Sequence, residues 1–161
     1  MFEKGSIQEE NQKYPELPKV LYLCMSITQG LLHDTYVYAG DLRPAFPTLL
    51  HPNEVLDGAV VSGNCVSACD KTTTYHHVHN PVVAELLEGH GKTLNCAAMR
   101  ITNENVNLAQ KERSSDWTAT LVEYLNLDGV IITQEGFGNP ETDLIMNCKK
   151  VEATGTPTVI I

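Results

Sequence analysis

Continuous apolar runs, each bounded by turn residues, constrain the fold of this chain more than any other feature. VIIT at 130–133 follows Asp128-Gly129, and similar runs begin at Val20 and Leu94 and close the chain as TVII. Short runs without alternation are typical of strands that are buried on both faces, which occur mainly in parallel sheets. The runs therefore predict a parallel sheet that helices cover on both sides.

Helix start and stop signals separate these runs. Asn80-Pro81 and Asn139-Pro140 each combine an N-cap residue with a proline suited to the first helical position. Gly91 and Gly155 are expected to end these two helices. A third helix is expected to begin at Ser114 or Ser115. Its apolar side chains recur at helical spacing and are predicted to face the core: Trp117, Leu121, Tyr124 and Leu125.

The order of these elements predicts an α/β fold, a mostly parallel sheet with helices on both faces, doubly wound and Rossmann-like. Residues 18–161 are expected to form this domain, with AVVS at 59–62 as a further buried strand. Residues 31–56, broken by prolines, are expected to be irregular and largely extended. The polar residues 1–17 are expected to be a mobile leader. Because the last apolar run reaches the final residue, we expect a fragment of a larger protein.

Composition limits the partners and the compartment. The formal net charge of -9 and the pI near 5.0 argue against nucleic acid and anionic membranes, and favour small molecules or proteins. The sequence has neither a long apolar span nor a secretion signal, so we expect a cytoplasmic protein. Five scattered cysteines argue against a disulfide framework. Cys24 and Cys148 are expected to be core thiols.

Polar residues follow each predicted strand. In an open parallel sheet, ligands bind beyond the carboxyl ends of the strands. A substrate is therefore expected to meet Asn103, Gln134, Glu135 and Gly136 at this edge, together with the loop that contains Cys65. Gly138 and Asn139, at a helix start, offer free backbone N–H groups to an anion such as a carboxylate.

The segment from Asp57 to Asn80 admits several interpretations. Thiolates and imidazoles are preferred zinc ligands, but the spacing between Cys65 and Cys69 departs from the usual CxxC pair, so zinc is disfavoured. A solvated polar loop is the plainest alternative. A third possibility is chemical: the Cys65 thiolate can attack the carbonyl of Asn64. Elimination and hydrolysis would then leave a pyruvoyl group, which captures a substrate amine and withdraws electrons from the adjacent carbon.

Five longer runs resemble one known family. The runs are GLLHDTYVY at 30–38, DGAVVSGNCVSACDK at 57–71, TNENV at 102–106, KERSSDWTA at 111–119 and DGVIITQEGFGNPETDLIMNCKK at 128–150. They closely resemble the protein B proprotein of the glycine/sarcosine/betaine reductases, with D-proline reductase as a more distant relative. The resemblance covers nearly everything from Pro18 to Ile161.

The resemblance implies a function and a partner set. The precursor would be cut between Asn64 and Cys65, and Cys65 would become the pyruvoyl that forms an imine with the substrate. Cys69, His76 and His77 are then candidates to assist processing or to bind substrate. Because the sequence contains no selenocysteine, a selenocysteine-containing subunit would complete the reduction and pass the product to protein A.

Two alternatives remain beside this hypothesis. The chain can be a truncated, non-catalytic α/β module that associates with reductase subunits, or a zinc domain built on the cysteines and histidines. The sequence does not choose among glycine, sarcosine and betaine as substrate. Betaine is chemically distinct, because its quaternary nitrogen cannot form an imine.

Overall fold

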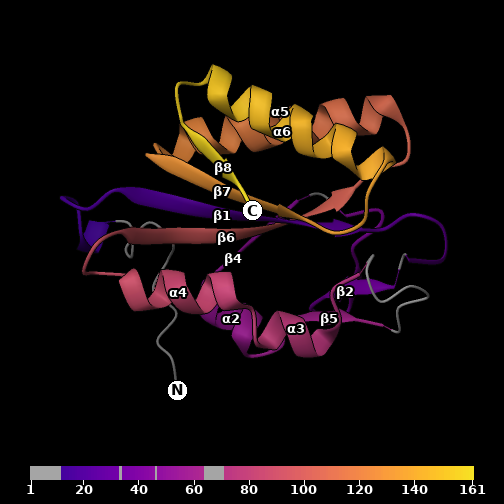
Figure 1. The fold of residues 1–161 in the computed structure, drawn as a ribbon, viewed down its shortest axis with the longest axis horizontal. Coiled ribbons are helices and arrows are strands. Elements are labelled where there is room, and N and C mark those ends of the chain that lie inside the picture. Colours follow the sequence, from indigo (N-terminus) through magenta and orange to yellow (C-terminus); the bar gives the residue numbers. More distant parts are fainter. Residues whose placement is uncertain (1–11, 33, 46, 64–70) are drawn as a thin grey trace.

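The computed structural model describes residues 12–32, 34–45, 47–63 and 71–161. A five-stranded sheet lies at its centre (Figure 1). In spatial order its strands are β4 (Thr48–Leu50), β6 (Asn95–Glu104), β1 (Lys19–Ile27), β7 (Gly129–Gln134) and β8 (Thr158–Ile160). The pairs formed among β6, β1, β7 and β8 are parallel, and β4 joins β6 in the antiparallel direction. The mostly parallel α/β sheet predicted from the sequence is confirmed.

The order of the strands creates a switch point beside β1. The chain passes from β1 to β6 on one side, then crosses to β7 on the other side of β1. In open α/β sheets, a crevice forms at the carboxyl ends of strands where the direction of winding reverses. Here these ends are Ile27 of β1 and Gln134 of β7.

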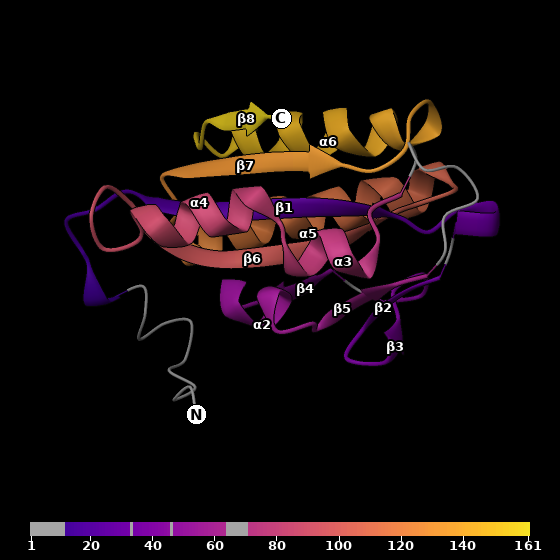
Figure 2. The ribbon, with the colours of Figure 1, turned by 60° about the horizontal axis from the view of Figure 1, so that its bottom comes forward.

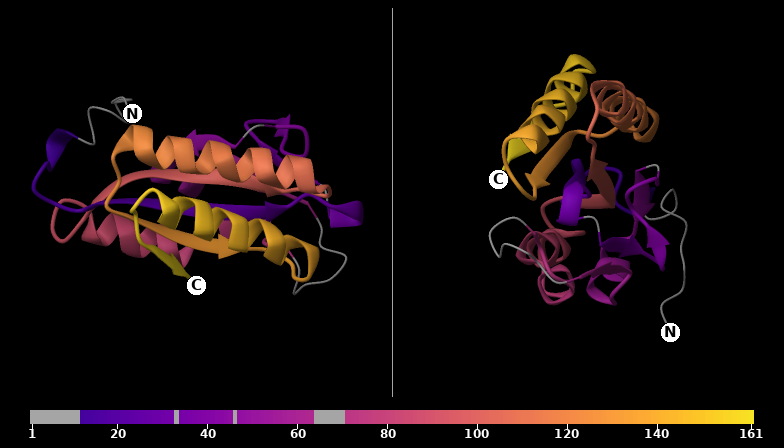
Figure 3. Two further views of the ribbon diagram at one scale, coloured as in Figure 1. Left: turned by 90° about the horizontal axis from the view of Figure 1, so that it is seen from above. Right: turned by 90° about the vertical axis from the view of Figure 1, so that its right-hand side faces the viewer.

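Helices cover both faces of the sheet, as Figures 1 and 3 show. One face carries α2 (Pro52–Leu56), α3 (Thr74–Val78) and α4 (Pro81–Gly89), and the other carries α5 (Leu108–Leu125) and α6 (Asn139–Ala153). Val83 and Leu86 of α4 pack in the first layer, and Val122 and Val151 pack in the second. Burying an aliphatic side chain of this size contributes about 1.5–3 kcal/mol, so both layers stabilise the sheet.

A second, smaller sheet lies beside the first (Figure 2). It is antiparallel and contains β3 (Gly40–Asp41), β2 (Thr35–Val37) and β5 (Val60–Ser62). The run AVVS therefore forms a strand, but not one of the main sheet. Thr35 and Val60 are buried, whereas Tyr36 and Val61 are exposed. This alternation is typical of a sheet with one solvated face, so continuous burial was the wrong prediction for this run.

The region predicted to be irregular is more ordered than expected. Besides β2, β3 and β4, it contains a 3-10 turn at Gly30–Leu32 and the short helix α2. The His51 side chain accepts the N–H of Asn53, and the Glu54 side chain accepts the N–H of His51. This capping box starts a helix directly at Pro52.

The helix α5 begins earlier than predicted and turns a different face to the core. The Asn107 side chain accepts the N–H of Gln110 at 3.0 Å, which sets the N-terminus ahead of Ser114. Trp117 is 51% exposed and Tyr124 is 74% exposed. The predicted core-facing stripe is therefore wrong for Trp117 and Tyr124, whereas Leu125 packs against the core as predicted. The buried side of α5 is mostly polar and consists of Lys111, Ser114, Ser115, Thr118 and Val122.

The ends of the other two long helices lie close to the predicted residues. The Asn80 side chain accepts the N–H groups of Val82 and Val83, so the predicted N-cap of α4 is confirmed. That helix ends at Gly89, and Gly91 adopts a positive φ in the turn that follows. For α6 the N-cap is Gly138 rather than Asn139. Within the described residues, no helix is long and apolar enough to cross a membrane.

Candidate functional site

A cleft of about 420 Å³ opens at the switch point between β1 and β7. It lies on the side of the sheet that α3 and α4 cover. Its lining combines side chains from four parts of the chain: Tyr22, Cys24, Lys71, Thr72, His76, Asn80 and residues 133–136. A cleft in this position is the usual place for a small ligand in an open α/β sheet.

Glu135 joins the separate parts of this cleft. Its side chain carboxylate accepts the N–H of Ile27 and the N–H of Thr72, both at 2.9 Å. The residue is only 6% exposed. Burial raises the pKa of the Glu135 carboxyl above its ordinary value, although both N–H groups and Lys71 oppose this rise. Glu135 thus connects Ile27, at the end of β1, with Thr72.

His77 lies on the short helix α3, not in a loop as the sequence suggested, and its side chain is next to that of Glu135. Its side chain is completely buried, and Nε2 is 3.7 Å from Oε1 of Glu135. Neither ring nitrogen has a hydrogen-bond partner among the described residues. Burial, together with the nearby Lys71 and His76, lowers the pKa of His77 to about 4. The imidazole is therefore neutral at pH 7.

His76 differs from His77 in exposure. It lines the cleft, and its Nδ1 lies 2.9 Å from the hydroxyl of Thr73. This contact fixes the ring at the mouth of the cleft. The two adjacent histidines of the sequence therefore have separate environments, one buried against a carboxylate and one at the surface.

Tyr22, Asn80 and Thr133 form a hydrogen-bonded wall of the cleft. The Tyr22 hydroxyl lies 2.8 Å from Thr133 Oγ1, and Asn80 Nδ2 donates to Tyr22 at 3.3 Å. Burial raises the pKa of Cys24, beside them, to about 12. Cys24 therefore stays a neutral thiol, in agreement with its predicted place in the core.

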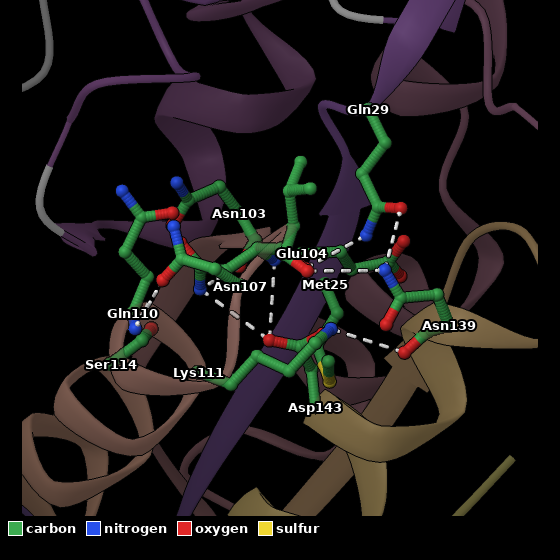
Figure 4. A network of polar contacts seen from close by, with 12 residues as sticks. Met25, Gln29, Asn103, Glu104, Asn107, Gln110, Lys111, Ser114, Asn139 and Asp143 are labelled. Carbon is green, nitrogen blue, oxygen red and sulfur yellow. Dashed lines mark hydrogen bonds and ion pairs between the residues drawn. The ribbon is translucent and has the colours of Figure 1, made fainter.

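Two further buried acids, Glu104 and Asp143, form a second layer near Glu135, and Figure 4 shows both of them. Glu104, at the end of β6, is fully buried, and its Oε1 accepts the N–H of Glu135 at 3.2 Å. Its Oε2 has no hydrogen-bond partner among the described residues. Burial, together with the neighbouring Glu135 and Asp143, raises the pKa of Glu104 to about 9. Glu104 is therefore protonated near neutral pH.

Asp143 of α6 belongs to the same layer but has a cation. It forms a buried ion pair with Lys111 of α5 and accepts the N–H of Asn105 at 3.2 Å. Lys111 also donates to the carbonyl of Asn139 at 3.1 Å. These contacts join the N-terminal turns of the two helices behind the cleft (Figure 4).

The remaining residues proposed from the sequence lie in different places. Gln134 and Gly136 line the cleft together with Glu135. Asn139 is directed toward Gln29, with Nδ2 3.2 Å from Oε1. Asn103 donates to the carbonyl of Arg43 at 3.0 Å and lines a separate cavity, and Gly138 borders another.

Asn64, Cys65 and Cys69 lie outside the described residues, so the structure leaves their predicted roles untested. The expected leader, residues 1–17, is described only from residue 12. There the Tyr14 ring meets His90 edge-on, with 5.1 Å between the ring centres. In the described part of the chain, no group of three or more His, Cys, Asp or Glu residues could hold a metal ion.

Comparison with known proteins shows the family to which the chain belongs. The profile of the family described as glycine/sarcosine/betaine reductase component B subunits matches residues 1–161. The chain belongs to this family. No solved structure matches the chain.

Component B relatives are similar over the full chain but are much longer. The chain is 61% identical to the glycine reductase complex component B subunits alpha and beta of Acetoanaerobium sticklandii, over 100% of the chain and 37% of that relative. The same protein of Peptoclostridium acidaminophilum is 61% identical over 99% of the chain and 37% of its own length. The sarcosine reductase complex component B subunit alpha of the latter organism is 53% identical, over 100% of the chain and 38% of the relative. The chain thus spans a little over a third of these component B proteins.

Sequence reasoning missed several residues that build the site. Thr72 and Lys71 carried no signal, because their partners lie far away in the sequence, at Glu135 and Asp34. Glu104 was visible only as one of the residues that follow a strand. Its burial depends on helices α5 and α6, which the local pattern does not place.

Proposed function

We propose that the chain is a substrate-binding subunit of a component B reductase, in which Cys65 is converted into a pyruvoyl group. The observation that carries the proposal is the family match over residues 1–161. The cleft adds support, because Lys71 and Thr72, which follow the segment that contains Cys65, line it directly. The cleft is also polar and large enough for a small amino acid.

The proposed processing needs a nucleophile and a base. The Sγ of Cys65 attacks the carbonyl carbon of Asn64 and displaces the amide nitrogen, which leaves a thioester. Elimination removes the Cα proton and breaks the Cβ–Sγ bond of residue 65, so residues 1–64 leave as a C-terminal thiocarboxylate that carries the sulfur. Residue 65 is then a dehydroalanine, whose enamine tautomerises to an imine, and hydrolysis with loss of ammonia leaves a carbonyl at residue 65. His76 and His77 are the candidate bases for the thiol proton, and Nε2 of His77 lies 3.7 Å from Oε1 of Glu135.

The proposed substrate is a small amino acid with a primary or secondary amine. The pyruvoyl carbonyl supplies an electrophile that captures such an amine and withdraws electrons from the adjacent carbon. Gln134, Glu135 and Gly136 surround the space where the substrate would lie. Glycine and sarcosine have the required nitrogen, and the curated relatives include reductases named for both.

The proposed partners follow from the chemistry of reduction. The sequence contains no selenocysteine, and the reductive step needs a strong nucleophile that removes the amine. We assign this role to a selenocysteine-containing subunit of the same complex, with transfer of the product to protein A. These partners are proposed for the assembled complex and not for the isolated chain.

Labelling with a carbonyl reagent tests the proposed cofactor. We expect phenylhydrazine to modify the 65–161 fragment of the purified protein, located by mass spectrometry. Cys65→Ala removes the sulfur and is expected to abolish both cleavage and labelling. Cys148→Ala is the matched control and is expected to label, because Cys148 lies on α6 and does not line the cleft. An uncut, unlabelled wild-type chain that binds other reductase subunits would instead favour a non-catalytic module.

A further inference from the structure

Asp34 contacts the chain on both sides of the proposed cleavage bond. Its backbone carbonyl accepts the N–H of Gly63 at 2.9 Å. Its side chain Oδ1 accepts a hydrogen bond from Lys71 Nζ at 2.7 Å. Gly63 and Lys71 are the described residues on either side of positions 64–70. One residue, 29 or more positions away in the sequence, thus holds both stems.

The contact with Gly63 explains why this position is a glycine. A Cβ added to Gly63 would lie 1.8 Å from Oδ2 of Asp34 and 2.6 Å from Cγ. No side chain fits at such distances unless the Asp34 carboxylate moves away. The carboxylate therefore packs directly on the backbone of the residue that precedes Asn64.

The contact with Lys71 is buried on the lysine side. The Lys71 side chain is completely buried, and Asp34 is 32% exposed. Lys71 Nζ also donates to the carbonyl of Leu32 at 2.8 Å. A buried ammonium requires such partners, because its desolvation is otherwise uncompensated. Lys71 is therefore held firmly at the edge of the cleft.

A second pair of contacts ties the same two stems together. Thr74 Oγ1 accepts the N–H of Ser62 and donates to the carbonyl of Ser62, each at 2.9 Å. Together with Asp34, this reciprocal pair fixes the spacing of the stems just outside residues 64–70. We call Asp34, Gly63 and Lys71 the stem clamp.

We infer that Asp34 is a positioning residue for self-cleavage, because the stem clamp holds the two chain ends that carry the Asn64–Cys65 bond. The inference rests on the proposed function. Intramolecular attack depends on a narrow range of distances and angles, and a displacement of about 1 Å can cost about 10²-fold in rate. A stem released from Asp34 samples many more conformations, so productive attack becomes rare.

Three variants test the stem clamp. Asp34→Asn alone leaves Lys71 buried without a counter-charge, so the double variant Asp34→Asn, Lys71→Met removes both charges together. Gly63→Ala keeps both charges but forces the carboxylate away from the backbone. The matched control is Asp41→Asn, whose carboxylate pairs with the exposed Arg43 at 3.0 Å.

The rate of fragment formation is measured by intact mass spectrometry on freshly purified protein. We expect cleavage to slow at least about tenfold in the double variant and in Gly63→Ala, while the control cleaves at the wild-type rate. Circular dichroism melting identifies variants that retain the fold. Cleavage at the wild-type rate in a folded double variant, or in folded Gly63→Ala, would overturn the role of Asp34 and leave the proposed function intact.

An uncut wild-type chain would contradict the proposed function, and hydrogen exchange then decides whether the stem clamp exists. Peptides that cover residues 60–63 and 71–74 are compared between the double variant and the control. Faster exchange in the double variant supports the stem clamp. Equal exchange overturns it.

Discussion

Glu104 and Asp143 are two buried carboxyl groups in one layer, yet they have opposite electrostatic environments. Asp143 contacts the Lys111 ammonium and accepts the N–H of Asn105. Glu104 accepts the N–H of Glu135 with one oxygen, and its other oxygen has no partner among the described residues. The Asp143 carboxylate is compensated by a cation. The Glu104 carboxyl is instead buried beside two other acids.

The difference shows two ways of burying an acid behind a cleft. A carboxylate with a cation in contact stays charged and joins two helices. A carboxyl without a cation takes up a proton, because burial penalises its charged form. Glu104 can therefore lie close to Glu135 without repulsion, and Glu135 remains available to hold Ile27 and Thr72.

The largest expected effect follows from removing the cation. Lys111→Met leaves Asp143 buried without a counter-charge, and we expect the free energy of unfolding to fall by about 3–5 kcal/mol. Chemical denaturation at pH 7 measures the change. Lys150→Met is the control, since Lys150 pairs with the 67%-exposed Asp116 and should change stability by less than about 1 kcal/mol. Equal losses in both variants would contradict the contrast.

A smaller effect depends on pH and isolates Glu104. Its pKa rises from 4.5 to about 9 on folding, so the folded state binds the extra proton between these values. Stability from this residue is therefore greatest at low pH and is lost as pH rises toward 9, at up to about 1.4 kcal/mol per pH unit. Glu104→Gln, which resembles the protonated acid, is expected to remove this slope.

Denaturation between pH 7 and pH 8.5 measures that slope, in a window above the range in which His77 titrates. Exposed Glu85→Gln is the matched control and should retain the wild-type slope. If the stability of Glu104→Gln depends on pH as strongly as that of the wild type, Glu104 is not the group that binds the proton.

The same layer shows what the sequence could predict. The parallel strands β1 and β6 followed from continuous apolar runs, because nearly complete burial leaves a direct compositional signal. The runs at β7 and β8 also form parallel strands, but β7 is only partly buried, and Val159 and Ile160 of β8 are exposed, so the burial predicted for the last run is wrong. The face of α5 did not follow, because its buried side contains Lys111, Ser114 and Ser115 while Trp117 is exposed. A buried ion pair with Asp143, 32 residues away, is invisible to hydrophobic periodicity.

The candidate site was predictable only in part. The carboxyl ends of the strands indicated Gln134, Glu135 and Gly136, and all three line the cleft, while their contact with a substrate stays a prediction. The stem clamp was not predictable, because Asp34, Gly63 and Lys71 meet only through the antiparallel pairing of β2 and β5. That pairing was missed because prolines at positions 44, 47 and 52 made residues 31–56 resemble a connection.

Intact mass spectrometry of the purified wild-type protein tests the proposed role of Cys65 most directly. We expect two associated fragments, residues 1–64 and 65–161, with the second starting in a group that lacks the nitrogen and sulfur of cysteine. A single chain of 17.7 kDa with an unmodified Cys65, in protein assembled with its reductase partners, would contradict the account.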